Sequence, residues 1–566
     1  MDNAGFWSVI PPLLTLVLAI ACKDVIFALV SGILSGVFIV AVQTGNWGYL
    51  FTGLADKIAD NLGDSWNIRI FLFCALLGGL VAILARTGAV VSFGQWAATK
   101  ISSRRGTLFC TFGLGIVIFI DDYFNSLAIG TAMRPIADRM KISRAKLSYI
   151  LDSTAAPVCI IAPVSSWVVT VMTYLRDSEG FETLQVSEMD FFLHVIPYNL
   201  YVLFSLLMVL CVCWGIPDFG AMRRAEKRAI SGLGLNNPEL YGEGVANAGG
   251  EDIASDGKKR ARPWDMLIAI GVLIVTSIVL FPVTAWRQGQ FEDGKIVKSF
   301  SQSMTEIPLG DAFRETDVSY ALLYAIVLTL IIVIVYFVAN RLLAIREIST
   351  TLIEGMRSMI PALAVLALAW AIGKVIRCTP DEGGVGLANY LADIVRDGYF
   401  PLILLPVALF GIACVTAFST GTSWGTMAIL IPITMPIAVS ASAAYGIVGA
   451  EQVELVAYIV AAAIGGSIFG DHASPVSDTT ILSATGAGCS CLEHVTTQFP
   501  YALFIAVCSV CGYGAGSFFW QYPIAGTNLF WSLPVSILVT GICFAVGVFI
   551  LIPFFAKRDE QLQNNN

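Results

Sequence analysis

Charged residues are scarce in this sequence of 566 residues: Asp, Glu, Lys and Arg make up 13% of it, whereas hydrophobic residues make up 57%. So few polar side chains cannot cover the surface of a water-soluble globule. The mean hydropathy is +0.77. Apolar runs of about 20 residues, the length that crosses a bilayer core of about 30 Å, recur along the whole chain. The composition therefore predicts an all-α polytopic membrane protein embedded in a lipid bilayer.

Several other functions lack their usual signals. A pI near 5.1 argues against nucleic acid as a partner, and the missing Walker A motif argues against ATP-driven pumping. His472 close to Ser474 is the one hint of a hydrolase, but Ser474 does not stand in a G-x-S-x-G elbow, so we expect no enzyme and no catalytic residues. The pair Cys489 and Cys491 near His494 lacks a second pair for zinc, so no cofactor is expected.

The apolar runs divide into two membrane halves. The polar segment 217–263 is rich in Gly, Asn and acidic residues, which predicts a mobile linker between an N-terminal half, 1–216, and a C-terminal half, 264–566. Candidate membrane spans lie at about 7–22, 25–43, 70–86, 107–121, 147–175, 191–216, 264–286, 319–339, 355–376, 399–418, 453–470, 499–519 and 530–555. Two further apolar pieces lie at 122–137 and 422–440, and we expect the first span to be a retained helix.

Lysine and arginine predict the orientation in the membrane. They gather at 134–146 and flank 217–263, so the positive-inside rule places both segments in the cytoplasm. Lys557 and Arg558 place the C-terminus there as well. The segments 176–190 and 287–318 are poor in basic residues, so we expect them outside.

Two segments echo each other in opposite topology. The run 149-YILDSTAAPVCIIAPVSSW-167 parallels 458-YIVAAAIGGSIFGDHASPVSDT-479, and 119-FIDDYFNS-126 stands where 418-FSTGTSWG-425 does. The predicted orientation makes the first core, about 107–175, start inside and the second, about 399–485, start outside. This pattern is typical of transporters built from inverted repeats with broken or re-entrant helices.

Proline and glycine are expected to break the helices in these cores. Non-helical backbone at membrane depth is tolerated only where it is buried in protein or lines a wet cavity. Its freed carbonyl and N–H groups can then bind ions or an anionic substrate. The expected breakers are Pro157, Pro163, Gly465, Gly466, Gly470 and Pro475.

Four aspartates in the cores are the candidate proton and Na⁺ ligands: Asp122, Asp152, Asp471 and Asp478. An ionised side chain at the bilayer centre costs about 2.5–3.5 kcal/mol or more, which favours a functional site over a purely structural polar network. Oxygen-rich neighbours suit a small cation. The candidate substrate-binding residues are Asn125, Ser153, Thr154, Ser165, Thr420, Gly421, Thr422, Ser423, His472, Ser474, Ser477 and Thr479.

The motifs 469-FGDHASPVSDTTILSATGAGC-489, 421-GTSWGT-426 and 120-IDDYFNSLAIGTAMRPIADR-139 resemble the NhaC family of sodium/proton antiporters, within the ion transporter superfamily. The resemblance implies Na⁺/H⁺ exchange, two helical hairpins, an elevator-type movement and a homodimer. It also implies a bacterial cytoplasmic (inner) membrane. The family includes a malate/lactate antiporter, so a small organic substrate stays open.

Competition between Na⁺ and H⁺ for intramembrane carboxylates is the predicted mechanism. Burial and neighbouring negative charge favour protonated carboxyls, so one of the four aspartates is expected to exchange a proton near neutral pH. The alternative is a Na⁺-coupled transporter of a small organic anion or amino acid, whose carboxylate would meet Thr420, Gly421 and Thr422. Substrate-dependent sodium uptake would distinguish the two.

Overall fold

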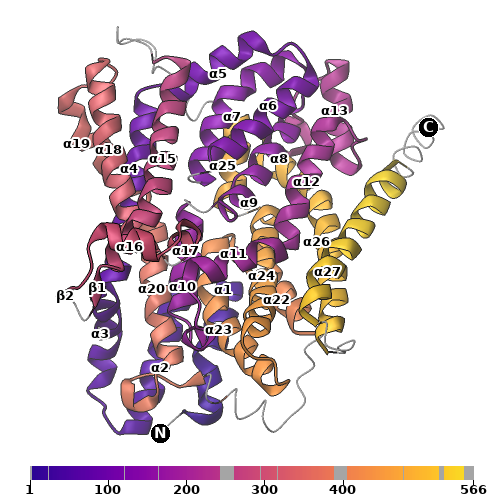
Figure 1. The fold of residues 1–566 in the computed structure, drawn as a ribbon. Coiled ribbons are helices and arrows are strands. Elements are labelled where there is room, and N and C mark those ends of the chain that lie inside the picture. The colour runs from indigo at the N-terminus through magenta and orange to yellow at the C-terminus, as the bar shows by residue number, and fades with distance from the viewer. Residues whose placement is uncertain are drawn as a thin grey trace.

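The protein is seen in a computed structural model, which describes residues 3–22, 24–119, 122–162, 165–241, 261–292, 295–314, 316–387, 390, 404–475, 477–521 and 528–553. Regular structure in these residues is helical apart from one antiparallel ladder of two-residue strands, β1 (Phe291–Glu292) and β2 (Lys295–Ile296). Figure 1 shows the arrangement of the helices. The predicted all-α class is confirmed.

Short helices precede and follow the long ones. The first half contains η1 (Gly5–Val9), α1 (Ile10–Cys22), α2 (Val25–Thr44), α3 (Tyr49–Gly63), α4 (Ser65–Arg86), α5 (Ala89–Lys100), α6 (Arg104–Val117), α7 (Asp122–Arg139), α8 (Arg144–Thr154), α9 (Ala156–Cys159), α10 (Ser166–Arg176), η2 (Phe181–Leu184), α11 (Glu188–Tyr198) and α12 (Leu200–Trp214). Next come α13 (Gly220–Ser231) and α14 (Pro238–Tyr241).

The second half begins with α15, a helix of 26 residues. It contains α15 (Pro263–Gln288), α16 (Phe300–Glu306), α17 (Leu309–Arg314), α18 (Val318–Ala339), α19 (Ile345–Ser358), α20 (Ile360–Arg377), η3 (Pro380–Glu382), α22 (Leu405–Thr420), α23 (Ser423–Ala444), α24 (Ala450–Ala473), α25 (Asp478–Ala487), α26 (Cys491–Gln521), α27 (Asn528–Val546) and a π turn (Gly547–Leu551).

Eight of the described helices are long and apolar enough to cross a membrane, and up to ten spans result if each bent helix pair counts as one. The chain is therefore an integral membrane protein. One bend was not expected: the predicted span 191–216 is divided into α11 and α12, which meet at 54°. Pro197 lies inside the last turn of α11 and lacks an N–H group, and the Asn199 side chain then caps α12.

Each repeat consists of a helical hairpin followed by a broken helix. The hairpin α6–α7 packs on α8, the first part of the first broken helix, and on α25, the last part of the second. The hairpin α22–α23 packs on α24, and α23 also contacts α10, the last part of the first broken helix. In Figure 1, α7, α8 and α25 lie above α10, α22, α23 and α24, so the chain runs downward in this view from α8 to α10 and upward from α24 to α25. The predicted inverted arrangement is confirmed.

The prolines and glycines of the repeats have different roles. Pro157 lies in the first turn of α9, just after the break at Ala155, and Pro475 lies in the turn between α24 and α25, so both prolines stand at breaks as predicted. Pro163 lies outside the described residues. The prediction that Gly465, Gly466 and Gly470 break the second helix is wrong, because α24 continues through them to Ala473.

Gly466 and Gly470 let α22 approach α24 closely. A Cβ atom at Gly466 would lie 2.3 Å from the carbonyl oxygen of Phe410, and one at Gly470 would lie 2.4 Å from Ala417 Cβ. Contacts this short require the backbone to move, so side chains at these positions would separate the two helices.

Substituting Gly466 by alanine is expected to destabilise the protein by about 1–3 kcal/mol through overpacking. A matched control is Gly411→Ala in α22, where an added Cβ would meet no atom within 4 Å; there alanine should be neutral or stabilise by about 0.5–1 kcal/mol. The unfolding temperature in detergent measures both. Equal unfolding temperatures of the two variants would contradict the close-packing role.

The predicted linker 217–263 is partly ordered. Its helix α13 buries Met222, Ala225 and Glu226, and residues 242–260 lie outside the described part of the chain. Glu226 joins α13 to the repeat core: it pairs with Arg104, accepts a hydrogen bond of 2.7 Å from the Ser143 amide and lies 3.1 Å from Lys146 Nζ. An amphipathic face and a buried carboxylate therefore fix this part of the segment.

Acidification is expected to weaken this attachment. Burial favours the protonated form of Glu226, but Lys146, the Ser143 amide and Arg104 outweigh it and hold the pKa of Glu226 below its ordinary value. A lowered pKa stabilises the fold above the unfolded value of about 4.3, and this contribution is lost as the pH falls through the folded pKa.

Glu226→Gln should therefore lower the stability at pH 7 by roughly 1.5–3 kcal/mol, the worth of a charged hydrogen bond. The gap in unfolding temperature between wild type and variant should shrink as the pH falls below about 4.3. The control is Glu239→Gln, at an exposed position of α14. A gap that stays constant on acidification would refute the ionic role.

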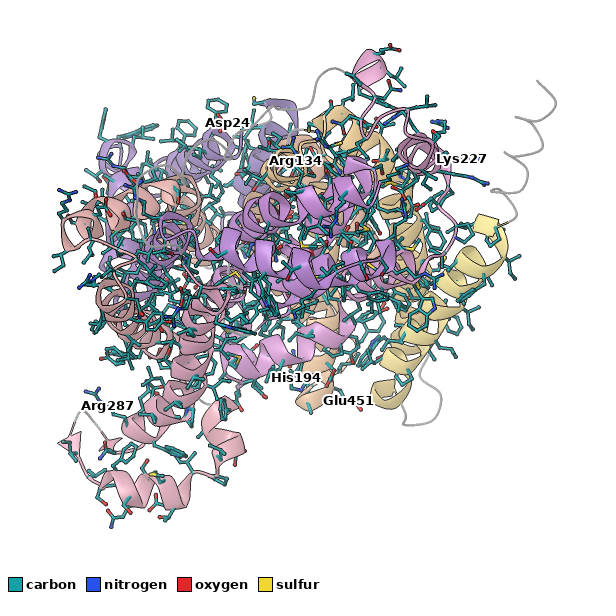
Figure 2. The ribbon with its side chains drawn as sticks, turned by 90° about the horizontal axis from the view of Figure 1, so that it is seen from above. Asp24, Arg134, His194, Lys227, Arg287 and Glu451 are labelled. Atoms are coloured by element: carbon teal, nitrogen blue, oxygen red, sulfur yellow. The ribbon has the colours of Figure 1, made fainter. Side chains whose placement is uncertain are left out.

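Residues that the sequence assigns to opposite membrane faces lie on opposite sides of the protein in Figure 2. Arg134 and Lys227 lie toward one side, whereas His194, Glu451 and Arg287 lie toward the other. Beyond Arg287 the chain projects from the rest of the protein, on the same side as Arg287. Which of the two sides is cytoplasmic, and the domain boundaries drawn from sequence, stay predictions.

Candidate functional site

The breaks of the two crossing helices bring two buried carboxylates together. Asp152 lies in the last turn of α8, and Asp471 lies in the last turn of α24, next to the turn that leads into α25. Asp152 is fully buried and Asp471 is 3% exposed. Each carboxylate therefore lies at the C-terminal end of a helix, where the last backbone carbonyls have no partner within the helix.

Hydroxyl groups surround Asp471. Ser477 Oγ donates to Asp471 Oδ1 at 2.6 Å, and Thr479 Oγ1 donates to Oδ2 at 3.2 Å. Both residues come from the turn and first helical positions of α25, so the break itself creates this shell. The Ser423 hydroxyl, at the start of α23, also interacts with the carboxyl. The environment of Asp471 consists of oxygen atoms.

Nitrogen groups surround Asp152. Gln498 Nε2 donates both to Asp152 Oδ2 and, at 2.7 Å, to the carbonyl oxygen of His472. His494 Nε2 lies 3.4 Å from Asp152 Oδ2, close enough for an ion pair when the imidazole is protonated. His472 Nδ1 lies 3.3 Å from the Tyr201 hydroxyl. Two buried imidazoles therefore adjoin this carboxylate.

Thr480 lies between the Asp152 carboxylate and the backbone of Asp471. Its Oγ1 lies 3.5 Å from Asp152 Oδ2 and 3.2 Å from the carbonyl oxygen of Asp471, and its one proton can be given to either. Within the described residues, no lysine or arginine forms an ion pair with Asp152 or Asp471. Two unneutralised carboxylates would be very costly at membrane depth, so this cluster requires a proton or a cation.

Asp122 and Asn125 lie in a neighbouring cluster that joins α7 to the first broken helix. Asp122 Oδ1 accepts a 2.9 Å hydrogen bond from Trp167 Nε1 of α10, and the Trp167 ring contacts that of Trp424 in α23. Asn125 Nδ2 lies 2.8 Å from the carbonyl oxygens of Gly115 and Ile118 and 3.2 Å from that of Thr154. Asn125 thus satisfies carbonyls freed at two helix ends.

Three predicted substrate-binding hydroxyls cap helices. Ser165 Oγ accepts from Val168 N at 3.1 Å, Thr422 Oγ1 from Gly425 N at 3.3 Å and Ser477 Oγ from Thr480 N at 3.4 Å. These hydroxyls fix the first turns of α10, α23 and α25. Of the three, Ser477 also donates a hydrogen bond to an aspartate, Asp471.

Other predicted residues complete the turns. Gly421 ends α22 with φ +71°, Thr420 Oγ1 donates to the Thr416 carbonyl, and Ser423 Oγ donates to the Ser467 carbonyl at 2.9 Å. The letters 421-GTSWG-425 match a nucleophile elbow, but they connect two helices rather than a strand and a helix. Ser423 therefore belongs to the packing of α23 on α24.

The remaining predicted residues lie near the breaks. Thr154 Oγ1 donates to the Ile150 carbonyl, Ser153 interacts with Tyr149, and Ser474 follows the end of α24. Asp478 begins α25, but its side chain lies outside the described residues. Its predicted role stays a prediction.

Three of the four predicted carboxylates have described side chains: Asp122, Asp152 and Asp471. Among the described side chains, no three His, Cys, Asp or Glu residues form a group that could hold a metal ion. Asp152 and Asp471 share one cluster through Thr480, whereas Asp122 contacts Trp167. A Na⁺ site here would consist of a carboxylate with hydroxyl and carbonyl oxygens.

Sequence reasoning missed Gln498, and it noted His494 only for its neighbouring cysteines. His494 and Gln498 are four residues apart, so they lie on one face of α26, and both are buried. Two buried polar residues at this spacing in an apolar helix are a signal that could have indicated an intramembrane site.

Comparisons with known proteins identify the family. A family model described as "Na+/H+ antiporter family" matches residues 158–518. A Haemophilus influenzae protein described as uncharacterized is 35% identical over 547 residues, which is 96% of each chain. Another H. influenzae protein, described as an uncharacterized Na(+)/H(+) antiporter, is 27% identical over 149 residues, which is 26% of this chain and 28% of its own.

Two solved transporter structures show weak likeness. The Alcanivorax borkumensis YdaH transporter is 13% identical, with 89% of this chain and 88% of its own covered and a TM-score of 0.41. Neisseria gonorrhoeae MtrF is 14% identical, with 89% and 85% covered and a TM-score of 0.38. The assignment rests instead on the family model, which spans more than half of the sequence: the chain belongs to the Na⁺/H⁺ antiporter family, whose members are transporters and not enzymes.

Proposed function

We propose that this family member belongs to the NhaC group and exchanges Na⁺ for H⁺, with Asp471 as the Na⁺ ligand and Asp152 as the proton site. The observation that carries the proposal is the buried pair Asp152 and Asp471, connected by Thr480 and without a lysine or arginine counter-ion in the described residues.

Chemistry divides the two roles. Na⁺ is a hard cation that prefers oxygen ligands, and Asp471 is surrounded by the hydroxyls of Ser477 and Thr479, with its own carbonyl beside Thr480. Asp152 instead adjoins His494 and Gln498. An imidazole can both accept and donate a proton, which suits His494 to deliver a proton to Asp152.

Electrostatic competition would couple the two ions. A proton on Asp152 or His494 adds one positive charge beside Asp471 and weakens its attraction for Na⁺; loss of that proton restores it. The site would then carry either Na⁺ or H⁺, which is what antiport requires. We propose that the two repeat cores, 107–175 and 399–485, move together in an elevator-type step relative to α4, α15, α18 and α19, which pack on one another.

Proteoliposomes with a trapped pH-sensitive dye test the proposal. An inward Na⁺ gradient is imposed with no organic solute present, and K⁺ and choline gradients of the same size serve as controls. A tenfold Na⁺ gradient supplies about 1.4 kcal/mol, enough to drive H⁺ outward. We expect prompt internal alkalinisation with Na⁺ alone, lost in protein-free liposomes.

Silence from protein shown to be folded would overturn Na⁺/H⁺ exchange. Sodium uptake that begins only when a small carboxylate or amino acid is added would instead support Na⁺-coupled transport of an organic substrate.

A further inference from the structure

The end of α13 and the residues that follow it lie against α25 and α26. We call residues 228–241 the strap. Asn236 Nδ2 donates a hydrogen bond of 2.9 Å to the carbonyl oxygen of Gly488, at the end of α25. Ser490 Oγ, just before α26, donates one of 2.7 Å to the carbonyl oxygen of Tyr241. The strap is therefore attached to the end of α25 and to the start of α26.

A buried ion pair completes this attachment. Glu493 lies in the first turn of α26, and its side chain is fully buried. Its Oε1 pairs with Arg228 Nη2, and its Oε2 accepts a hydrogen bond of 3.0 Å from the Asn237 amide. Both oxygens of this carboxylate therefore contact the strap. A buried ion pair that loses one partner leaves an uncompensated charge, so removal of Arg228 should displace Glu493 or the strap.

The start of α26 also carries the groups that contact Asp152. His494 follows Glu493 directly, and its Nε2 lies 3.4 Å from Asp152 Oδ2. Gln498, about one turn further along, donates to the same oxygen. Since α26 is a continuous helix here, a shift of its first turn moves both contacts with Asp152. The position of the strap thus determines how closely His494 approaches Asp152.

We propose that Arg228 is a positioning residue for proton delivery. Through Glu493 it holds the first turn of α26, so that His494 stays within reach of Asp152. The inference rests on the proposed proton role of Asp152. It extends that role to a residue of α13, a helix that is not among the candidate membrane spans and that lies in the segment between the two halves of the chain.

The first test is Arg228→Gln in proteoliposomes, with Na⁺-driven proton movement and ²²Na⁺/Na⁺ exchange measured side by side. A misplacement of 1 Å can slow a reaction by a factor of about 100, so proton movement should fall roughly 10- to 100-fold. ²²Na⁺/Na⁺ exchange at saturating Na⁺ should continue, because the hydroxyls that contact Asp471 come from the start of α25. The matched control is Arg224→Gln, at an exposed position of the same helix, which should leave both reactions at the wild-type rate.

A second variant combines Arg228→Gln with Glu493→Gln. It should recover most of the proton movement, because no unpaired charge is then left at the start of α26 and the two amides can form a hydrogen bond. Recovery would show that the single variant fails through Glu493 and that the protein still folds. A double variant no more active than Arg228→Gln would overturn the role of this pair. An equal loss of both exchange reactions in the single variant would overturn it as well.

Hydrogen–deuterium exchange of the full chain in detergent tests the attachment without transport. Amides in 491–498 should exchange faster in Arg228→Gln by about tenfold or more, the worth of a hydrogen bond to a charged group. Arg224→Gln should not change them. Unchanged amide exchange in Arg228→Gln would overturn the inference, whatever the transport result. A wild type that moves no protons with Na⁺ would instead overturn the proposed function and with it the positioning role, while the amide data still report on the strap.

Discussion

Asp471→Asn is expected to abolish Na⁺-driven proton movement and also the exchange of ²²Na⁺ for Na⁺. Asparagine keeps the shape of the side chain and one accepting oxygen, so Ser477 can still donate to it, and the amide NH2 can donate to Thr479 Oγ1 in place of the present contact. What is lost is the negative charge. A unit charge pair at about 4 Å is worth about 4 kcal/mol at an effective dielectric constant of 20, so Na⁺ binding should weaken roughly 500- to 1,000-fold.

The control for this variant is Asp311→Asn, an identical change at an exposed position of α17. The Asp311→Asn control should carry out both Na⁺/H⁺ exchange and ²²Na⁺/Na⁺ exchange at the wild-type rate. Size-exclusion profiles and unfolding temperatures establish that the compared proteins are folded. If Asp471→Asn still exchanges ²²Na⁺ for Na⁺, Asp471 does not provide the charge that binds sodium, and the proposed assignment is wrong.

The hydroxyl contacts of Asp471 could be anticipated because they are local. Asp471, Ser477 and Thr479 lie within nine residues, and Pro475 between them indicates the turn that brings them together. The glycine-rich part of the same segment was misleading, because glycine permits either a break or a close helix contact. Only the position of α22 decides this, and there the carbonyl of Phe410 faces Gly466.

The environment of Asp152 could not be anticipated in the same way. Its partners His494 and Gln498 are more than 340 residues away in the sequence, and their pairing depends on how α26 packs on α8. Asp122 was a candidate ion ligand from its motif, but in the structure its carboxylate accepts a hydrogen bond from Trp167 and joins α7 to α10. Residue type identifies candidates for an intramembrane site, whereas the packing of crossing helices selects among them.

Asp152→Asn is expected to separate the two ions. The variant keeps Asp471 and its hydroxyl shell, so one negative charge still balances Na⁺ and ²²Na⁺/Na⁺ exchange at equal pH and saturating Na⁺ should continue. The neutral asparagine has the charge of protonated Asp152, so by the proposed competition the Na⁺ concentration that gives half-maximal exchange should rise. Proton movement driven by Na⁺ should fall at least about 100-fold, since a neutral amide cannot exchange the proton that Asp152 carries.

The contrast between the two asparagine variants is what a merely structural role would not produce. If Asp152 only held a structural hydrogen bond from Gln498, its loss would reduce both exchange reactions together. A second variant, Gln498→Glu, keeps the size of the side chain but places a second carboxyl beside Asp152. It should shift the pH at which exchange is half-maximal. If Asp152→Asn loses ²²Na⁺/Na⁺ exchange to the same extent as Asp471→Asn, both carboxylates bind Na⁺ together and the proton must compete for the pair as a unit. If instead Asp152→Asn still moves protons, the proton site lies elsewhere, and Asp478 is then the remaining aspartate of the second repeat to test.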